Sequence, residues 1–189
     1  MKSALLVIDC QKSFKARPFW SEQQFPAWCL AQQRLIDGCV ARNIPVVQVL
    51  HQSSDGGPFD PQSGLVSTLD EIRVEPDLLV RKQRHSALAG TPLLDWLIGQ
   101  NIQRLLISGI RTEQCCETTA RHASDLGFRV DFFSDATLTF DMVDPHSGKR
   151  VAAADIQART ELVLAGRFAR ICLVDSWLAN EEHQESLCD

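Results

Sequence analysis

Continuous apolar runs alternate with helix-period segments along this chain. Short runs of this kind, bounded by polar or turn residues, are typical of strands buried on both faces of a parallel sheet. The pattern predicts four clear strands, a weaker fifth and a sixth that closes the chain: Ala4 to Ile8, Pro45 to Leu50, Arg104 to Ser108, Phe128 to Phe133, Leu78 to Val80 (the weaker one) and Arg170 to Val174.

The segments between these runs have apolar residues at helical spacing. The predicted helices are Pro26 to Asn43, Pro92 to Gln100, Gln114 to Leu126 and Ala152 to Ala165. Gly127 and Gly166 stand where a glycine ends a helix, and Thr91 is a plausible N-cap before Pro92. Two stretches, His51 to Leu69 and Thr139 to Arg150, are predicted to be long loops.

Strands that alternate with helices predict an α/β fold with three layers, in which helices cover both faces of a mostly parallel sheet of about six strands. The chain has 189 residues with 44% hydrophobic and 23% charged residues, which suits one globular domain over residues 1–189. No internal repeat or linker interrupts it.

The charge and the cysteines narrow the class of protein further. The formal net charge is -5, which disfavours nucleic acid as a partner. No run approaches the length of a membrane span and the first apolar run is too short for a signal peptide, so we expect a cytoplasmic protein. Seven cysteines, with no Cys-x-x-C pair, disfavour a disulfide framework and a structural zinc site, so most thiols should be buried in the core.

Three polar residues follow predicted strands at their carboxyl ends. Asp9 follows the first strand, Lys82 follows the weak strand, and Cys115 lies in the first turn of the helix after the strand at Arg104. Ligands bind outside the carboxyl ends of the strands in open α/β sheets. The sequence therefore predicts that an acid, a base and a thiol meet at one edge of the sheet.

Cys115 differs from its neighbour Cys116 by its expected place on the helix. With Thr112 as the N-cap, Cys115 is the third helical residue, where the positive helix end favours an anion and lowers a thiol pKa. Cys116 falls on the apolar face. We interpret Cys115 as the reactive thiol and Cys116 as a packing residue.

Other chemistry has weaker support. The five histidines are scattered, and no two stand at metal-ligand spacing. A Cys–His dyad that uses His85 or His146 is an alternative to the Asp9–Lys82–Cys115 set. A redox sensor built on Cys115 and Cys116 is disfavoured, because adjacent cysteines form a strained ring. The sequence contains no Gly-x-Gly-x-x-Gly motif and no P-loop motif, so nucleotide binding has no local support.

At these residues the sequence resembles the isochorismatase-like cysteine hydrolases, which have a Rossmann-like fold, over roughly Ala4 to Val174. Three blocks in order are similar to those of the family. The first block is Leu6-Val7-Ile8-Asp9-Cys10-Gln11-Lys12-Ser13-Phe14, and the second is Val80 to Leu93 with its Ser86-Ala87-Leu88. The third is Ser108 to Ala123, with its Thr112-Glu113-Gln114-Cys115-Cys116, followed by Leu126-Gly127-Phe128.

The resemblance implies a role for each residue. Asp9 would be the general base, Lys82 would stabilise charge, and Cys115 would attack an amide-like carbon to give a covalent intermediate that water hydrolyses. Backbone N–H groups of Arg111 and Cys115 would form the oxyanion hole beside a cis peptide at Ile110-Arg111. Phe14 would wall the pocket.

The chain also departs from the family. Cys116 replaces a usual Val, Leu88 replaces a usual Phe, and Arg111 is bulky where many members have a small residue. Nicotinamidases of the group bind a metal through Asp-x-His after the second strand, whereas Gln48-Val49-Leu50-His51-Gln52 has no such Asp. We therefore expect no metal or other cofactor, and a substrate other than nicotinamide.

The resulting prediction is a hydrolase of a small amide-, imide- or carbamoyl-type metabolite. Arg84 and His85 are candidate substrate-binding residues for an anionic or carbonyl-rich ligand, or else solvated surface residues. Vinyl-ether cleavage of the isochorismatase type and a non-catalytic binding protein are the alternatives. We also expect a homo-oligomer, a dimer or larger, in which the aromatic residues Phe19, Trp20, Phe25 and Trp28 are core or interface.

Overall fold

A six-stranded parallel sheet forms the centre of the molecule, as the apolar runs predict. The computed structural model describes residues 1–185; Cys188 lies outside them, as does the side chain of His183. The strand order is β3-β2-β1-β4-β5-β8, and every pairing between these strands is parallel. The strands are β1 (Ser3–Ile8), β2 (Val46–His51), β3 (Leu78–Lys82), β4 (Arg104–Ile110), β5 (Arg129–Leu138) and β8 (Arg170–Cys172).

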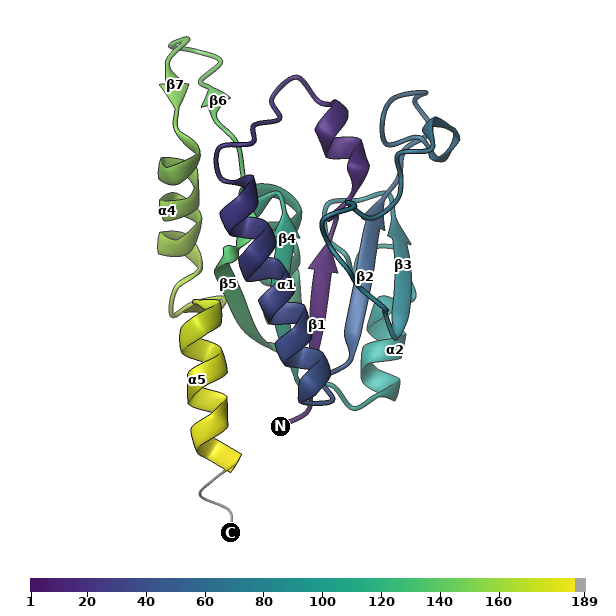
Figure 1. The fold of residues 1–189 in the computed structure, drawn as a ribbon, viewed down its shortest axis with the longest axis vertical. Coiled ribbons are helices and arrows are strands. Elements are labelled where there is room, and N and C mark those ends of the chain that lie inside the picture. Colours follow the sequence, from purple (N-terminus) through teal and green to yellow (C-terminus); the bar gives the residue numbers. More distant parts are fainter. Residues whose placement is uncertain (186–189) are drawn as a thin grey trace.

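Helices cover both faces of the sheet, which completes the three layers (Figure 1). One apolar core joins residues of the sheet to α2 (Leu93–Gly99), α3 (Glu117–Asp125) and α4 (Ala153–Leu164). The second core lies on the opposite face, under α1 (Phe25–Ala41) and α5 (Val174–Glu185). Alternate residues of β1 enter the two cores, Leu6 the first and Leu5 the second, because successive side chains of a strand point to opposite faces.

The predicted ends of β3, β5 and β8 were wrong, the first two because polar residues occur inside the strands. β3 continues through the exposed Arg81 to the buried Lys82, and β5 continues through Ser134 to Leu138. The strand predicted to reach Val174 ends at Cys172, since Val174 already starts α5, a helix that the pattern did not indicate.

The two predicted loops contain short elements. The first has a 3-10 turn, η2 (Pro61–Ser63), and an isolated bridge between Gln11 and Thr68. The second has an antiparallel hairpin of β6 (Met142–Val143) and β7 (Arg150–Val151), which projects from the carboxyl end of the sheet (Figure 1). A further 3-10 turn, η1 (Lys12–Ala16), follows β1.

The helix that bears Cys115 begins differently from the prediction. Arg111 and not Thr112 is the N-cap, and a π-helical turn, η3 (Thr112–Cys116), precedes α3. π-helical turns inside or beside α-helices are frequent at functional sites. Across residues 1–185, no helix has the length and apolar character that crossing a membrane requires.

Candidate active site

Asp9, Lys82 and Cys115 meet at the carboxyl edge of the sheet, as predicted. Lys82 Nζ lies 2.7 Å from Asp9 Oδ2 and donates a hydrogen bond of 3.3 Å to Cys115 Sγ. The side chains of Asp9 and Lys82 are fully buried, and Cys115 is 6% exposed. A carboxylate, an ammonium and a thiol thus share one desolvated volume with the lysine in the middle.

The backbone around β1 and β4 fixes the position of Asp9. Asp9 directly follows β1 and has a φ of 52°, a left-handed conformation that turns the chain out of the sheet. Gly109 of β4 lies beside Ile8, and a Cβ on Gly109 would stand 1.9 Å from the Ile8 carbonyl oxygen. The φ of Gly109 is 126°, so both conformation and close approach require glycine there.

Charge on Lys82 is stabilised by its two partners in the site. Burial by itself lowers the pKa of the Lys82 ammonium, but the Asp9 carboxylate and the Cys115 sulfur outweigh it, so this pKa is raised. Asp9 Oδ1 accepts no hydrogen bond from residues 1–185. Asp9 therefore retains an oxygen that can accept a proton.

The expected low pKa of Cys115 was wrong. Burial raises the pKa of this thiol, the Asp9 carboxylate raises it further, and Lys82 opposes both without overcoming them. The prediction counted only the helix end, which favours an anion, and omitted the cost of desolvating a thiolate. A raised pKa favours the protonated thiol, which a base must ionise before the sulfur can attack.

Cys116 has the packing role that was predicted. It is fully buried in the first core beside Ala120 and Ala123. Burial raises the pKa of its thiol well above the usual value. Five of the six described cysteines are buried and all six are free, with Cys29 half-buried: Cys10, Cys29, Cys39, Cys115, Cys116 and Cys172.

His51 is a site residue that the sequence interpretation left among the scattered histidines. It ends β2, and its Nδ1 lies 3.3 Å from Lys82 Nζ. The buried side chain of Gln11 accepts a hydrogen bond from His51 N (2.8 Å) and donates one to His51 O (3.0 Å). The signal for His51 was its place at the end of an apolar run, the same feature that singled out Asp9.

Of the predicted substrate-binding residues, His85 reaches the site. Its Nδ1 lies 3.8 Å from Cys115 Sγ, and the residue is exposed to solvent. Arg84 is exposed and donates a hydrogen bond to the neighbouring Gln83 carbonyl oxygen. Phe14 is buried and packs edge-on against Phe59 at 5.0 Å.

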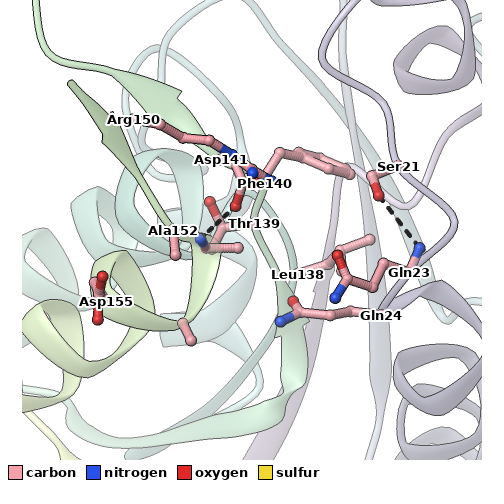
Figure 2. A pocket seen from close by; sticks show the side chains of 12 residues that line it. Ser21, Gln23, Gln24, Leu138, Thr139, Phe140, Asp141, Arg150, Ala152 and Asp155 are labelled. Atoms are coloured by element: carbon pink, nitrogen blue, oxygen red, sulfur yellow. Dashed lines mark hydrogen bonds and ion pairs between the residues drawn. The ribbon is translucent and has the colours of Figure 1, made fainter. Parts of the chain in front are cut away.

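The backbone of Arg111 belongs to the predicted oxyanion hole, and its side chain packs against residues that line or contact a neighbouring cavity. The Ile110–Arg111 peptide is cis, as the resemblance implied. The Arg111 guanidinium is buried against Glu113 at 2.9 Å and stacks over Phe140. Phe140 and Thr139, whose hydroxyl donates to Glu113, line a cavity of about 390 Å³ between β5, the start of α4 and the segment before α1 (Figure 2).

A metal site of the nicotinamidase kind does not fit these residues. Val49, a fully buried core residue, stands two positions before His51, where the metal motif has Asp. His51 Nδ1 already faces an ammonium, which repels a cation. Among residues 1–185, no three or more His, Cys, Asp or Glu residues are grouped so that they could hold a metal ion.

A parallel α/β sheet with a buried acid, lysine and cysteine at its carboxyl edge defines the class, that of open-sheet α/β proteins with a candidate active site at the strand ends. The sequence model of the isochorismatase domain matches residues 3–154. The chain belongs to the isochorismatase family, whose members are hydrolases.

Relatives and solved structures agree with this assignment. The chain is 31% identical to Nicotinamidase 3 of Arabidopsis thaliana over 156 residues, which cover 74% of each protein. It is 29% identical to streptothricin hydrolase of Streptomyces noursei over 180 residues, which cover 91% of this chain and 59% of that protein. A crystal structure of an isochorismatase-family protein from Chromobacterium violaceum ATCC 12472 superposes with a TM-score of 0.86 at 30% identity, covering 94% of this chain and 92% of that one.

Proposed function

We propose that this protein hydrolyses a C–N bond of a small amide-, imide- or carbamoyl-type metabolite, through a thioester-type intermediate on Cys115. One observation carries the proposal: Lys82 Nζ is within 2.7 Å of Asp9 and 3.3 Å of Cys115 Sγ, in a site where the acid and lysine side chains are fully buried. The desolvated thiol and its adjacent carboxylate suit nucleophilic catalysis with an internal base.

The first half of the reaction is acylation of the thiol. The Asp9 carboxylate takes the proton from the Cys115 thiol, and Lys82 stabilises the thiolate as it forms. The sulfur attacks the carbonyl carbon, and the backbone N–H groups of Arg111 and Cys115 donate to the oxyanion. Asp9 then returns its proton to the leaving nitrogen, the C–N bond breaks, and ammonia or an amine departs.

The second half releases the product. A water molecule that enters from the side of His85 gives a proton to Asp9 and attacks the thioester. The C–S bond breaks, the acid leaves, and Cys115 recovers its proton from Asp9. Water is the single co-substrate of this cycle.

The relatives support C–N chemistry more than any particular substrate. Nicotinamidase 3 and streptothricin hydrolase are hydrolases of amide C–N bonds. Nicotinamide itself is disfavoured here, because Val49 occupies the place of the metal-binding Asp. The exposed His85 beside the sulfur favours a substrate with a carbonyl or carboxylate near the scissile bond.

Intact-protein mass spectrometry during turnover tests the proposal. The protein is mixed with a panel of primary amides, cyclic imides and N-carbamoyl amino acids and quenched in acid within the first turnovers. We expect an adduct on the Cys115 peptide for at least one class, together with release of ammonia or an amine. Cys115→Ala should show neither.

The same experiment separates the alternatives. Hydrolysis that persists in Cys115→Ala, without an adduct, would replace the proposal by a thiol-independent reaction such as vinyl-ether cleavage. Saturable binding of a panel member with no turnover in the wild type would indicate a binding protein. Adduct formation at another cysteine would contradict the assignment of Cys115 as nucleophile.

A further inference from the structure

Three groups that can accept a proton or a hydrogen bond surround the Lys82 ammonium. Asp9 Oδ2 lies 2.7 Å from Nζ as an ion pair. Cys115 Sγ and His51 Nδ1 each lie 3.3 Å from it. An ammonium has three donors and no acceptor, so the contact with His51 is a hydrogen bond in which unprotonated Nδ1 accepts.

We propose that His51 is a positioning residue for Lys82: its neutral, Nε2-protonated ring accepts the third N–H and holds the ammonium between Asp9 and Cys115. This inference rests on the proposed function only for its catalytic consequence. The contact between Lys82 Nζ and His51 Nδ1 is part of the structure whatever reaction the site carries out. A lysine has four rotatable side-chain bonds, so without its third acceptor the ammonium can turn away from the sulfur.

The surroundings of His51 fix the ring in the required place. Gln11 holds the His51 backbone from both sides, and Gln11 Nε2 also donates to Ser13 Oγ at 2.9 Å. The ring packs edge-on against Phe59, with centroids 5.6 Å apart. Gln11 and Phe59 come from different loops, so the position of the imidazole does not depend on Lys82 alone.

Protonation of His51 would undo this arrangement. The titratable groups that face the ring are Lys82 at the end of β3, Asp9 after β1, and His85 in the loop after β3. Burial lowers the pKa of His51, Lys82 lowers it further, and Asp9 opposes them, so the pKa is below that of an ordinary histidine. When pH falls through this pKa, a second cation forms 3.3 Å from the ammonium, and the accepting lone pair is lost.

Nuclear magnetic resonance of the histidine side chains tests the contact without any substrate. In ¹⁵N-labelled wild-type protein at neutral pH, we expect His51 to show an unprotonated Nδ1 and a protonated Nε2. In Lys82→Met the pKa of His51 should rise, whereas in Asp9→Asn it should fall. A wild-type His51 with a protonated Nδ1, or a titration that Lys82→Met leaves unchanged, would overturn the proposal.

A pair of variants tests the catalytic consequence on a substrate that the mass-spectrometric panel has supplied. His51→Leu removes the acceptor, and we expect kcat to fall on the order of 10²-fold with KM unchanged. His51→Asn keeps an acceptor oxygen near the place of Nδ1, and should recover most of kcat and extend activity to lower pH, because Asn does not titrate.

Controls separate a positioning role from a structural one. Both variants should unfold at urea concentrations close to each other, since they differ little in size. Equal losses of kcat in His51→Leu and His51→Asn, or an acid limb at the same pH in His51→Asn as in the wild type, would reject the positioning role. If Cys115→Ala stayed active, the proposed function would fail, while the resonance experiment would still decide the contact between His51 and Lys82.

Discussion

Cys115 and Cys116 have different surroundings although one peptide bond separates them. Cys115 Sγ contacts Lys82 and His85 at the edge of the sheet. Cys116 has 0% exposure and packs among the small residues of α3. The π-helical turn η3 places the two side chains on different sides of the chain, one toward the site and one toward the core.

Alanine substitution should therefore have opposite effects at the two positions. Cys115→Ala should abolish C–N hydrolysis and leave the unfolding midpoint nearly unchanged. Cys116→Ala should retain most activity but lower the free energy of unfolding by about 1 kcal/mol, as expected for a small core truncation. Urea titration and a turnover assay on the same samples measure both. An inactive Cys116→Ala beside an active Cys115→Ala would reverse the assignment.

Asp9 should act on Cys115 in two opposed ways. As the base it is required for hydrolysis, but as a neighbouring anion it raises the pKa of the thiol. Asp9→Asn should therefore lose activity about as completely as Cys115→Ala, while the Cys115 thiol becomes more acidic, because Lys82 still favours the thiolate. Ultraviolet absorbance of the thiolate against pH, with Cys115→Ala subtracted, measures this shift. A Cys115 pKa unchanged in Asp9→Asn would show that the carboxylate does not act on the sulfur.

At the scale of elements, β1 and β4 position the site through their close approach. Ile8 and Gly109 are register partners, and β4 shifts its register against β5 between Ile107 and Gly109. Asp9 and the Ile110–Arg111 peptide follow directly from these two residues. A change in this pairing should therefore act on the acid and on the proposed oxyanion hole together.

Gly109→Ala should destabilise the protein and impair the site. The new Cβ would collide with the Ile8 carbonyl oxygen, and the φ of 126° is unfavourable for alanine. We expect a loss of at least ~1–3 kcal/mol in the free energy of unfolding. Gly99→Ala, at an open position near the end of α2, is the matched control and should be neutral or stabilising by ~0.4–1 kcal/mol. Equal midpoints for the two variants would contradict this interpretation of Gly109.

The sequence predicted elements where burial made the pattern continuous. β1, β2 and β4 are buried over nearly their whole length, so their apolar runs were unambiguous. The extension of β3 to Lys82 was missed, because a buried lysine looks polar in sequence and only its partner Asp9 makes the burial possible. α5 was missed because its hydrophobic pattern is weak, with Val174 and Trp177 as its buried anchors in the described part.

The sequence predicted those site residues that follow strands or match the family motifs, and it did not predict the contacts between them. Asp9, Lys82 and Cys115 were found because each follows a strand. The contact between His51 and Lys82 joins residues 31 positions apart and depends on the pairing of β2 with β3. The raised pKa of Cys115 depends on how deeply the thiol is buried and on the nearby Asp9 carboxylate. The spacing of residues along the chain does not reveal either of these.

At the scale of the whole molecule, the buried thiols connect stability to pH. Burial raises the pKa of Cys29 and Cys172 to about 11 and that of Cys39 to about 12, from 9.0. Thiols whose pKa is raised in the folded protein stabilise it fully below the unfolded pKa, and this contribution is lost as pH rises.

The free energy of unfolding should therefore fall above pH 9. Each thiol that ionises only on unfolding contributes a slope of about 1.4 kcal/mol per pH unit. Urea titrations between pH 8 and pH 11, roughly the window in which unfolded thiols ionise, measure it. Cys39→Ala should reduce the slope by one thiol, because Cys39 is fully buried and free. An unchanged slope in Cys39→Ala would contradict a role for this thiol.

Assembly of several copies remains a prediction from the family resemblance. Phe25 and Trp28 are buried inside the protomer, so they are core and not interface. Exposed apolar side chains lie elsewhere, among them Leu162 on α4 and Val143 on the projecting hairpin. We expect sedimentation velocity to give a dimer or larger species. A monomer at every concentration would reject this expectation.

The parallel sheet also gives the molecule two unlike poles. The strands begin at the pole where the chain starts, and α5 runs toward the same pole (Figure 1). The site lies at the other pole, where the strands end. A surface or a fluorescent label attached through Met1 would therefore leave the exposed His85, beside Cys115, open to solution, which makes this chain suited to immobilised assays.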